Sequence, residues 1–366
     1  MSIFSSLKIG QEKYPALTGI RALGATAVFF DHFPPFPDRQ ITLNVMAFFF
    51  ALSGFLIVRI YYERAQLNRS WLTKYFVNRY ARIYPVYFLL LTLALCLQRD
   101  FEPWDLLTNY TLTHALFHGT KLIIQPSWSL TVEECFYVLA PLLMILARIY
   151  NTLVPLALGG LSLLLALVVS KLGIAFLGTP AFVLTTTFFG HFLEFFAGAY
   201  LALAVMKLEK SGTIHTPGCQ FTLAGLIGVL LLSFAMSRIY GHPPLDVRAV
   251  VLINNFLIPF PIALLYWGLV RERSILSQFL SGKFLGLLGR ASYSFYLLHT
   301  LIVNYISVPL LDATGHRIAW VILTLLFTWC ASILLFAFYE EPVNLFIRRK
   351  FLSNTKQIGL PATLFR

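Results

Sequence analysis

Long apolar runs recur from one end of this sequence to the other, and they limit its fold more strictly than any other feature. A helix that crosses a bilayer needs about 20 mostly apolar residues. Runs of this kind lie near residues 15–33, 41–62, 84–100, 128–149, 152–170, 184–206, 220–237, 249–270, 284–311 and 317–339. The pattern therefore predicts an all-α integral membrane protein with about ten transmembrane helices.

The composition favours this class over a soluble one. Apolar and aromatic residues make up 58% of the chain and charged residues only 12%, whereas soluble domains carry about 25% charged residues. The formal net charge of +12 is typical of basic cytoplasmic loops rather than of a nucleic-acid-binding surface. We therefore expect membrane lipids among the partners and no nucleic acid.

The distribution of basic residues predicts the orientation in the membrane. When both termini are placed in the cytoplasm, most of the 28 Lys and Arg residues fall in cytoplasmic segments, as the positive-inside rule requires. An odd number of spans would mix the two sets of loops. We therefore predict a multi-pass protein of the plasma membrane (the bacterial inner membrane). Its polytopic domain would cover residues 1–352, followed by a short cytoplasmic tail, 353–366.

Ionisable side chains inside membrane spans are costly, so each is a candidate for function. In the first run, Arg21 and His32 are eleven residues apart. This is about three helical turns, which places them on the same face about 16 Å apart along the axis. Arg21 would hold an anionic substrate that enters from the cytoplasm and reaches His32. Alternatively, Arg21 extends to lipid headgroups and His32 is an interfacial residue. The spacing alone leaves both interpretations open.

Two more charged clusters lie near the predicted third and fourth spans. Arg79 and Arg82, at the predicted cytoplasmic start of the third span, share a helix face and suit phosphates or carboxylates. Ordinary positive-inside anchoring is the alternative. Glu133 and Glu134 open the fourth span, and two adjacent carboxylates cannot both face lipid. They predict either a salt bridge to one of the arginines or a role in binding or proton transfer.

The last two runs also carry polar groups. Ser292, Tyr296 and His299 keep roughly one face of the ninth run. After the tenth run, Pro342 predicts the end of the helix.

Other polar features favour structural interpretations or an outer lid. The outer loop 101–127 places aromatic and charged residues between apolar ones, which suits an interfacial helix or a lid over a cavity. His191 and Glu194 share a face of the sixth run, and such a pair is more often structural than catalytic. The four cysteines form neither a disulfide framework nor a metal-ligand spacing; they are Cys96, Cys135, Cys219 and Cys330.

Together these patterns resemble the acyltransferase family 3 of membrane proteins, which moves acyl groups onto extracytoplasmic sugars and related acceptors. The resemblance extends roughly from Tyr14 to Arg349. Its motifs follow the family's order: RALGATAVFFDH with Arg21 and His32, FFFALSGFLI, RYARIYPVY with Arg79 and Arg82, SWSLTVEECFYVLAP, GRASYSFYLLHT and YEEP. Each motif is weak by itself, but the ordered set is specific.

The resemblance implies roles for individual residues. His32 would be the catalytic base, and Glu133 would belong to the same catalytic core. Arg21, Arg79 and Arg82 would bind the donor. The other substrate-binding residues that it implies are Trp128, Ser129, Tyr137, Tyr296 and His299. One departure is Asn78, which stands where many members have a further Arg.

We therefore expect a membrane O-acyltransferase that moves a short acyl group, most simply acetyl, from cytoplasmic acyl-CoA to a hydroxyl group. The acceptor would be extracytoplasmic or membrane-associated and would contain a sugar. Acyl-CoA would be a co-substrate, and neither a bound cofactor nor a metal is expected. The alternative is a transporter or flippase of an amphiphilic substrate that uses the same polar core, although the sequence shows no inverted repeats. A purely structural scaffold does not explain so many ionisable groups in spans.

Overall fold

Helices make up nearly all of the described chain. The computed structural model describes residues 13–33, 39–98, 100–172, 177–212, 216–239, 246–308 and 317–352. Its α-helices are α1 (Pro15–His32), α2 (Arg39–Tyr61), α3 (Arg69–Leu97), α4 (Pro103–Tyr110), α5 (Trp128–Ile149), α6 (Leu153–Lys171), α7 (Pro180–Thr186), α8 (Phe188–Lys210), α9 (Gln220–Ile239), α10 (Asp246–Leu252), α11 (Pro259–Arg271), α12 (Ile275–Leu280), α13 (Lys283–Ile302), α15 (Arg317–Leu335) and α16 (Glu341–Leu352).

Shorter helical segments connect or extend these helices. The 3₁₀ helices are η2 (Tyr62–Arg64), η3 (His114–Leu116) and η4 (Gln125–Ser127), and the π-helical segments are η5 (Ile253–Leu257), η6 (Val303–Ser307) and η7 (Phe336–Glu340). In the described ranges, β pairing is limited to an isolated bridge between Thr216 and Glu272. The all-α class predicted from the sequence is confirmed.

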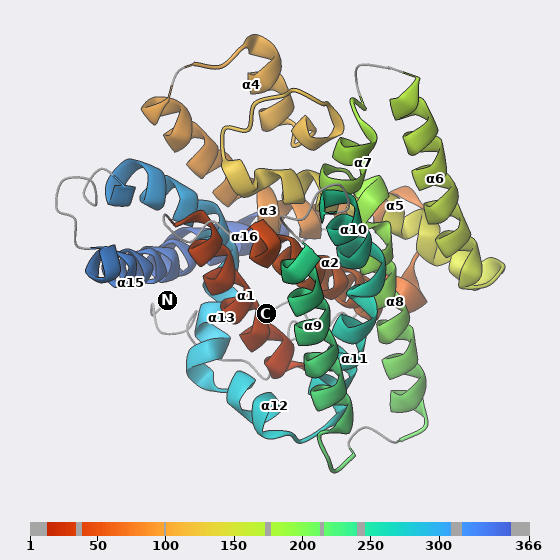
Figure 1. The fold of residues 1–366 in the computed structure, drawn as a ribbon. Coiled ribbons are helices and arrows are strands. Elements are labelled where there is room, and N and C mark those ends of the chain that lie inside the picture. The colour runs from red at the N-terminus through yellow and green to blue at the C-terminus, as the bar shows by residue number, and fades with distance from the viewer. Residues whose placement is uncertain are drawn as a thin grey trace.

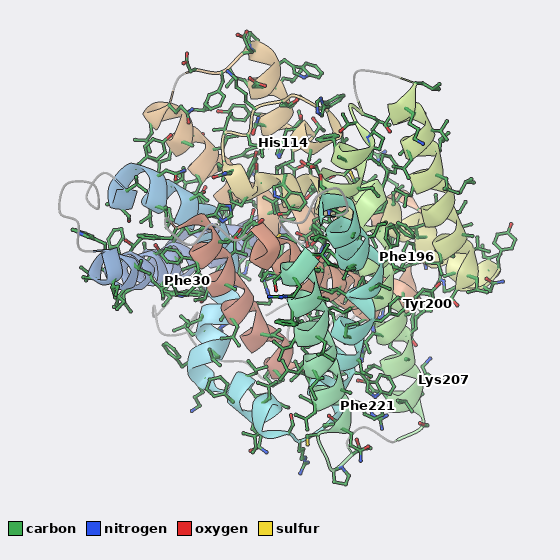
Figure 2. All side chains as sticks on the ribbon, viewed as in Figure 1. Phe30, His114, Phe196, Tyr200, Lys207 and Phe221 are labelled. Carbon is green, nitrogen blue, oxygen red and sulfur yellow. The ribbon has the colours of Figure 1, made fainter. Side chains whose placement is uncertain are left out.

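The helices form one bundle with distinct ends (Figure 1). α1 and α2 lie in its middle with α13 beside α1, α6 and α15 lie at opposite sides, α4 lies at one end and α12 at the other. The most extensive helix pairs are α2 with α8, α1 with α13 and α9 with α11. Figure 2 shows Phe196, Tyr200 and Lys207 following one another along α8, away from the end that holds His114. The central helices therefore run between an α4 end and an α12 end.

Small residues allow the central helices to approach closely. A Cβ at Gly198 would overlap the carbonyl oxygen of Ala51, so α8 packs backbone to backbone on α2. A Cβ at Gly289 would overlap the carbonyl oxygen of Thr18, which does the same for α13 on α1. Small residues have this role in membranes because lipid tails are as apolar as side chains, so close packing contributes much of the association.

This packing makes a testable prediction about two glycines of α13. Gly289→Ala is expected to lower the free energy of unfolding by about 1–3 kcal/mol, because the added methyl group must displace the backbone of α1. Gly286→Ala is the matched control, since a Cβ there meets nothing within 4 Å and Ala favours a helix over Gly. Thermal or SDS-induced unfolding in detergent measures both. Equal stability of the two variants would contradict this account of the α1–α13 contact.

Eight segments of the described chain are helical, long and apolar enough to cross a membrane. They are Asn44–Arg64, Arg69–Leu97, Gln125–Ile149, Leu153–Lys171, Pro180–Lys210, Gln220–Ile239, Ala249–Arg271 and Ile318–Leu352. The two predicted spans outside this group correspond to α1 and α13. Both form continuous helices, but their polar side chains lower the mean hydropathy. The multi-pass helical architecture agrees with the sequence, while the count of ten and the side of the termini stay predictions.

Two predicted boundaries were wrong. The third run was placed near 84–100, but α3 begins at Arg69, where the side chain of Asn68 accepts a hydrogen bond from the Trp71 backbone N–H at 2.8 Å. Pro342 does not end the last helix, because α16 continues to Leu352. The helix runs without a break from α15 through the π-helical η7 into α16, so Pro342 lies inside it, next to the π-helical turn. The predicted tail, 353–366, lies outside the described residues.

Candidate functional site

One cavity gathers polar residues from five helices. It opens between α1, α2, α3, α5 and α13, and its empty space, including the part open to solvent, is about 800 Å³. Seven of the residues that the sequence marked as site candidates line it: Arg21, Arg79, Arg82, Ser129, Glu133, Tyr137 and Tyr296. These positions span most of the chain, so the fold brings the separate motifs to one place. The other three candidates, His32, His299 and Trp128, do not line it.

Arg79 is held on the cavity wall by two tyrosines. Its guanidinium carbon lies 5.6 Å from the ring centroid of Tyr61 and 5.7 Å from that of Tyr137. The side chain is buried, and its Nε–H has no hydrogen-bond partner among the described residues. Aromatic faces stabilise a cation, and Arg is well suited to such sites. The arrangement leaves a positively charged donor beside an open cavity.

Glu133 is bound by hydroxyl groups rather than by an arginine. The hydroxyls of Ser53 and Tyr137 both donate to its Oε1. The ion pairs found in the described part of the chain are Lys13–Glu209, Arg59–Glu209, His191–Glu194 and Lys210–Glu63. Neither Glu133 nor Glu134 belongs to them, so the salt-bridge interpretation of the sequence is not supported. Glu133 instead connects α2 and α5 at the cavity wall.

A further carboxylate approaches from the end of the chain. Glu340, in η7, is buried and accepts a hydrogen bond from Ser294 at 2.6 Å. It interacts electrostatically with Arg82 and Arg21. Glu340 therefore offsets part of the positive charge of the cavity, and it ties η7 to α13.

Ser129 and Tyr296 close the cavity toward its α4 end. The Ser129 and Tyr296 hydroxyls lie 2.7 Å apart, and each lies within hydrogen-bond distance of the Pro126 carbonyl, at 3.0 and 2.8 Å. The Tyr296 hydroxyl also lies 3.4 Å from the Met46 sulfur. These contacts join α2, α5 and α13 at one point of the cavity wall.

His32 and His299 meet just beyond this closure. His32 Nδ1 lies 3.0 Å from the Val28 carbonyl and 3.4 Å from His299 Nε2. The centroids of the two rings are 5.1 Å apart, and the ring planes meet at 68°. The His299 ring also lies 6.0 Å from that of Tyr296, which lines the cavity. The chain thus places a histidine pair at the boundary between the arginine-rich cavity and the α4 end.

Trp128 lies apart from the cavity. Its ring packs 6.2 Å from Phe50 and 5.6 Å from His191. His191 is fully buried in an ion pair with Glu194, with 3.0 Å between Nδ1 and Oε2. The geometry is that of a packed structural cluster behind the cavity, and it agrees with the structural interpretation of His191 and Glu194.

Segment 101–127, the predicted outer loop, is ordered by buried polar groups. Asp105 in α4 accepts hydrogen bonds from the Lys121 backbone N–H at 2.9 Å and the Glu102 backbone N–H at 3.3 Å. His114 Nε2 lies 3.2 Å from the Ser127 hydroxyl. Burial lowers the pKa of His114 to about 4, so this imidazole is neutral near pH 7. The segment is folded around α4, and its role as an interfacial helix or a lid stays a prediction.

The sequence analysis missed two residues of the site and the burial of a third. Ser53 stands in an apolar run, and a polar residue beside Gly54 could have marked it. Tyr61 ends the predicted second run and was not singled out. Glu340 belongs to the YEEP motif, but the burial of its side chain was not predicted. In the described ranges, no three His, Cys, Asp or Glu side chains are grouped so that they would hold a metal ion.

Comparisons with known proteins match most of this chain. A family model described as "Acyltransferase domain" matches residues 14–337. The peptidoglycan O-acetyltransferase OatA of Listeria monocytogenes is 25% identical over 356 residues, which cover 90% of this chain and 56% of that protein. The acyltransferase MdmB of Streptomyces mycarofaciens is 26% identical over 346 residues, covering 84% of this chain and 81% of that protein. This chain therefore spans little more than half the length of the Listeria relative. No solved structure matches it.

Proposed function

Because this chain belongs to the acyltransferase-domain family, we propose that it is an O-acyltransferase of the bacterial inner membrane. It moves a short acyl group, most simply acetyl, from cytoplasmic acyl-CoA to a hydroxyl of an extracytoplasmic or membrane-associated acceptor that contains a sugar. The observation that carries this proposal is the cavity that gathers Arg21, Arg79 and Arg82 next to the His32–His299 pair.

The proposed binding of acyl-CoA rests on the positive charge of the cavity. Acyl-CoA carries several phosphates, and arginine binds phosphate through paired charge-assisted hydrogen bonds. Three arginines line the cavity, and the buried Nε–H of Arg79 has no partner in the described part of the chain. The three guanidinium groups make the cavity wall positively charged, which suits a polyanion. Acyl-CoA acts here as a co-substrate, and the proposal includes no cofactor.

In the proposed chemical step, His32 acts as the general base. A carbonyl oxygen only accepts hydrogen bonds, so the contact with Val28 places the proton of neutral His32 on Nδ1. Nε2 then carries a lone pair. It removes the proton of the acceptor hydroxyl while that oxygen attacks the thioester carbonyl, and the tetrahedral intermediate collapses to an ester and a CoA thiolate. The imidazolium returns its proton to the thiolate. A general base of this kind contributes about 10²–10⁴ in rate.

The proposed binding of the sugar acceptor rests on the predicted outer loop, 101–127. Trp104 and Tyr110 in α4 are half or nearly half exposed, and exposed aromatic rings offer apolar faces on which sugar rings can stack. The Listeria relative is named for peptidoglycan, which is an acceptor of this chemical class. We therefore propose a sugar hydroxyl as the acceptor group, delivered from the α4 side.

The orientation completes the proposal and is tested by reporter fusions. Ten spans, including α1 and α13, with both termini in the cytoplasm, would place loop 101–127 outside and segments 63–75 and 271–283 inside. A periplasm-active reporter should function only in the outer loop, and a cytoplasm-active reporter only in the other two segments. An inverted result at 271–283 would overturn the ten-span topology.

The activity itself is tested with purified protein in detergent or proteoliposomes. Acetyl-CoA should release free thiol in the presence of an oligosaccharide acceptor, and mass spectrometry should find the acceptor heavier by one acetyl group. In a deletion strain, the surface glycans should lose the same modification. Movement of an amphiphile across the vesicle membrane without any thiol release would instead favour a transporter.

A further inference from the structure

We infer that His299 is a positioning residue for His32, which holds the reacting imidazole in one tautomer and orientation. This inference rests on the proposed function, because it gives His299 a role only if His32 acts as the base. It replaces the direct contact with substrate that the sequence suggested for His299. The side chain of His299 is fully buried, so it acts through its neighbour.

Backbone carbonyls determine the tautomers of both rings. His299 Nδ1 lies 3.3 Å from the Phe295 carbonyl, so neutral His299 carries its proton on Nδ1 and a lone pair on Nε2. His299 Nε2 lies 3.4 Å from His32 Nδ1, which carries a proton because it also contacts the Val28 carbonyl. His32 therefore offers its Nδ1–H as a donor, and His299 offers the lone pair of Nε2 as the acceptor. His32 Nε2 remains as the basic atom.

The surroundings of His299 make it a rigid support. Its ring stacks on Phe295 with 6.0 Å between the centroids and 10° between the planes. Phe295 in turn stacks on Trp329 of α15, with 4.0 Å between the centroids. His32, by contrast, is the last residue of α1 and is only partly buried. A side chain at a helix end needs an external support if it is to keep one orientation.

The pair also has an electrostatic consequence for the reaction. When His32 Nε2 takes the acceptor proton, the imidazolium becomes positively charged and its Nδ1–H becomes a stronger donor. The lone pair of His299 Nε2 faces this group, so the contact strengthens as charge develops. A partner of this kind fixes the tautomer and stabilises the charged form of a general base. His299 would thus favour the transition state more than the ground state.

Two substitutions at His299 separate positioning from simple packing. His299→Gln keeps an acceptor oxygen near the place of Nε2, whereas His299→Phe fills the space without an acceptor. We expect the Phe variant to lose about tenfold to hundredfold in kcat, the range known for outer partners that orient a histidine in metal sites. The KM for acetyl-CoA should stay at the parent value. The Gln variant should recover most of the lost kcat.

A double substitution tests whether His299 acts through His32. If it does, His32→Ala with His299→Phe should be no slower than His32→Ala alone, because residues that act as a unit are not additive. Equal kcat of the Phe variant and the parent, a raised KM for acetyl-CoA, or additive losses would each overturn the inference. If the Phe variant does not insert, His299→Met is compared with His299→Gln in the same way. An active His32→Ala protein would instead refute His32 as the base. This outcome contradicts the proposed mechanism and is distinct from the results that test His299.

Discussion

Replacing His32 with Ala is expected to reduce kcat at least about a hundredfold while the protein still inserts and folds. His32→Gln should do no better, since it retains a hydrogen-bonding group but cannot take up the proton. The reason is the position of His32 beyond the arginine-lined cavity, with Nε2 as the basic atom. Steady-state thiol release from acetyl-CoA measures the loss.

Controls on α1 separate this effect from a general disturbance. Thr26→Ala removes a hydroxyl that bonds to the Ala22 carbonyl at 2.8 Å, and it should leave kcat at the parent value. Arg21→Ala should raise the KM for acyl-CoA more than it lowers kcat, since Arg21 lines the cavity. A folded His32→Ala protein with near-parent turnover would show that the proposed base is wrong, even though the family assignment would stand.

The donor arginines should show the second largest effect. Arg82→Ala is expected to raise the KM for acyl-CoA about tenfold or more, because each charge-assisted hydrogen bond to phosphate contributes about 1.5–3 kcal/mol. Arg79→Ala should do the same. Lys should rescue either position only partly, since an ammonium group cannot form the paired hydrogen bonds of a guanidinium. Donor titrations at saturating acceptor measure the change.

A matched control uses the same helix. Arg69 lies at the exposed start of α3 and does not line the cavity, so Arg69→Ala should bind the donor as the parent does. Arg79→Ala also removes the cation between Tyr61 and Tyr137, and its stability in detergent must be measured with its KM. If the KM for acyl-CoA were unchanged in both Arg79→Ala and Arg82→Ala, these arginines would be interpreted as membrane anchors instead of donor-binding residues.

Local features of this protein were readable from the sequence. The membrane class followed from apolar runs, and Arg21 and His32 do lie on one continuous helix, α1. The order of the motifs was also sufficient to identify the family. These features depend on residues near one another in the chain, because the helix period and its hydrogen bonds link each residue to neighbours three and four positions away.

The start of α3 shows where local reasoning becomes uncertain. Hydropathy placed the third run near residue 84, yet α3 begins at Arg69. The residues between mix apolar and aromatic side chains with four basic ones, so they do not form an uninterrupted apolar run. Tertiary packing shows that this stretch is partly covered: Tyr75 and Asn78 are buried, and Arg79 lies between two tyrosines from α2 and α5.

The contacts that define the candidate site were decided by the tertiary structure. Glu133 meets Ser53 and Tyr137 rather than an arginine, and His32 meets His299, 267 positions further along the chain. In a bilayer, lipid tails are as apolar as the helix surfaces, so hydropathy does not indicate which face of a helix packs against which neighbour. That choice depends on close approaches such as Gly289 against Thr18. The sequence therefore determined the helices and the chemical groups they carry, and helix packing determined which of those groups meet.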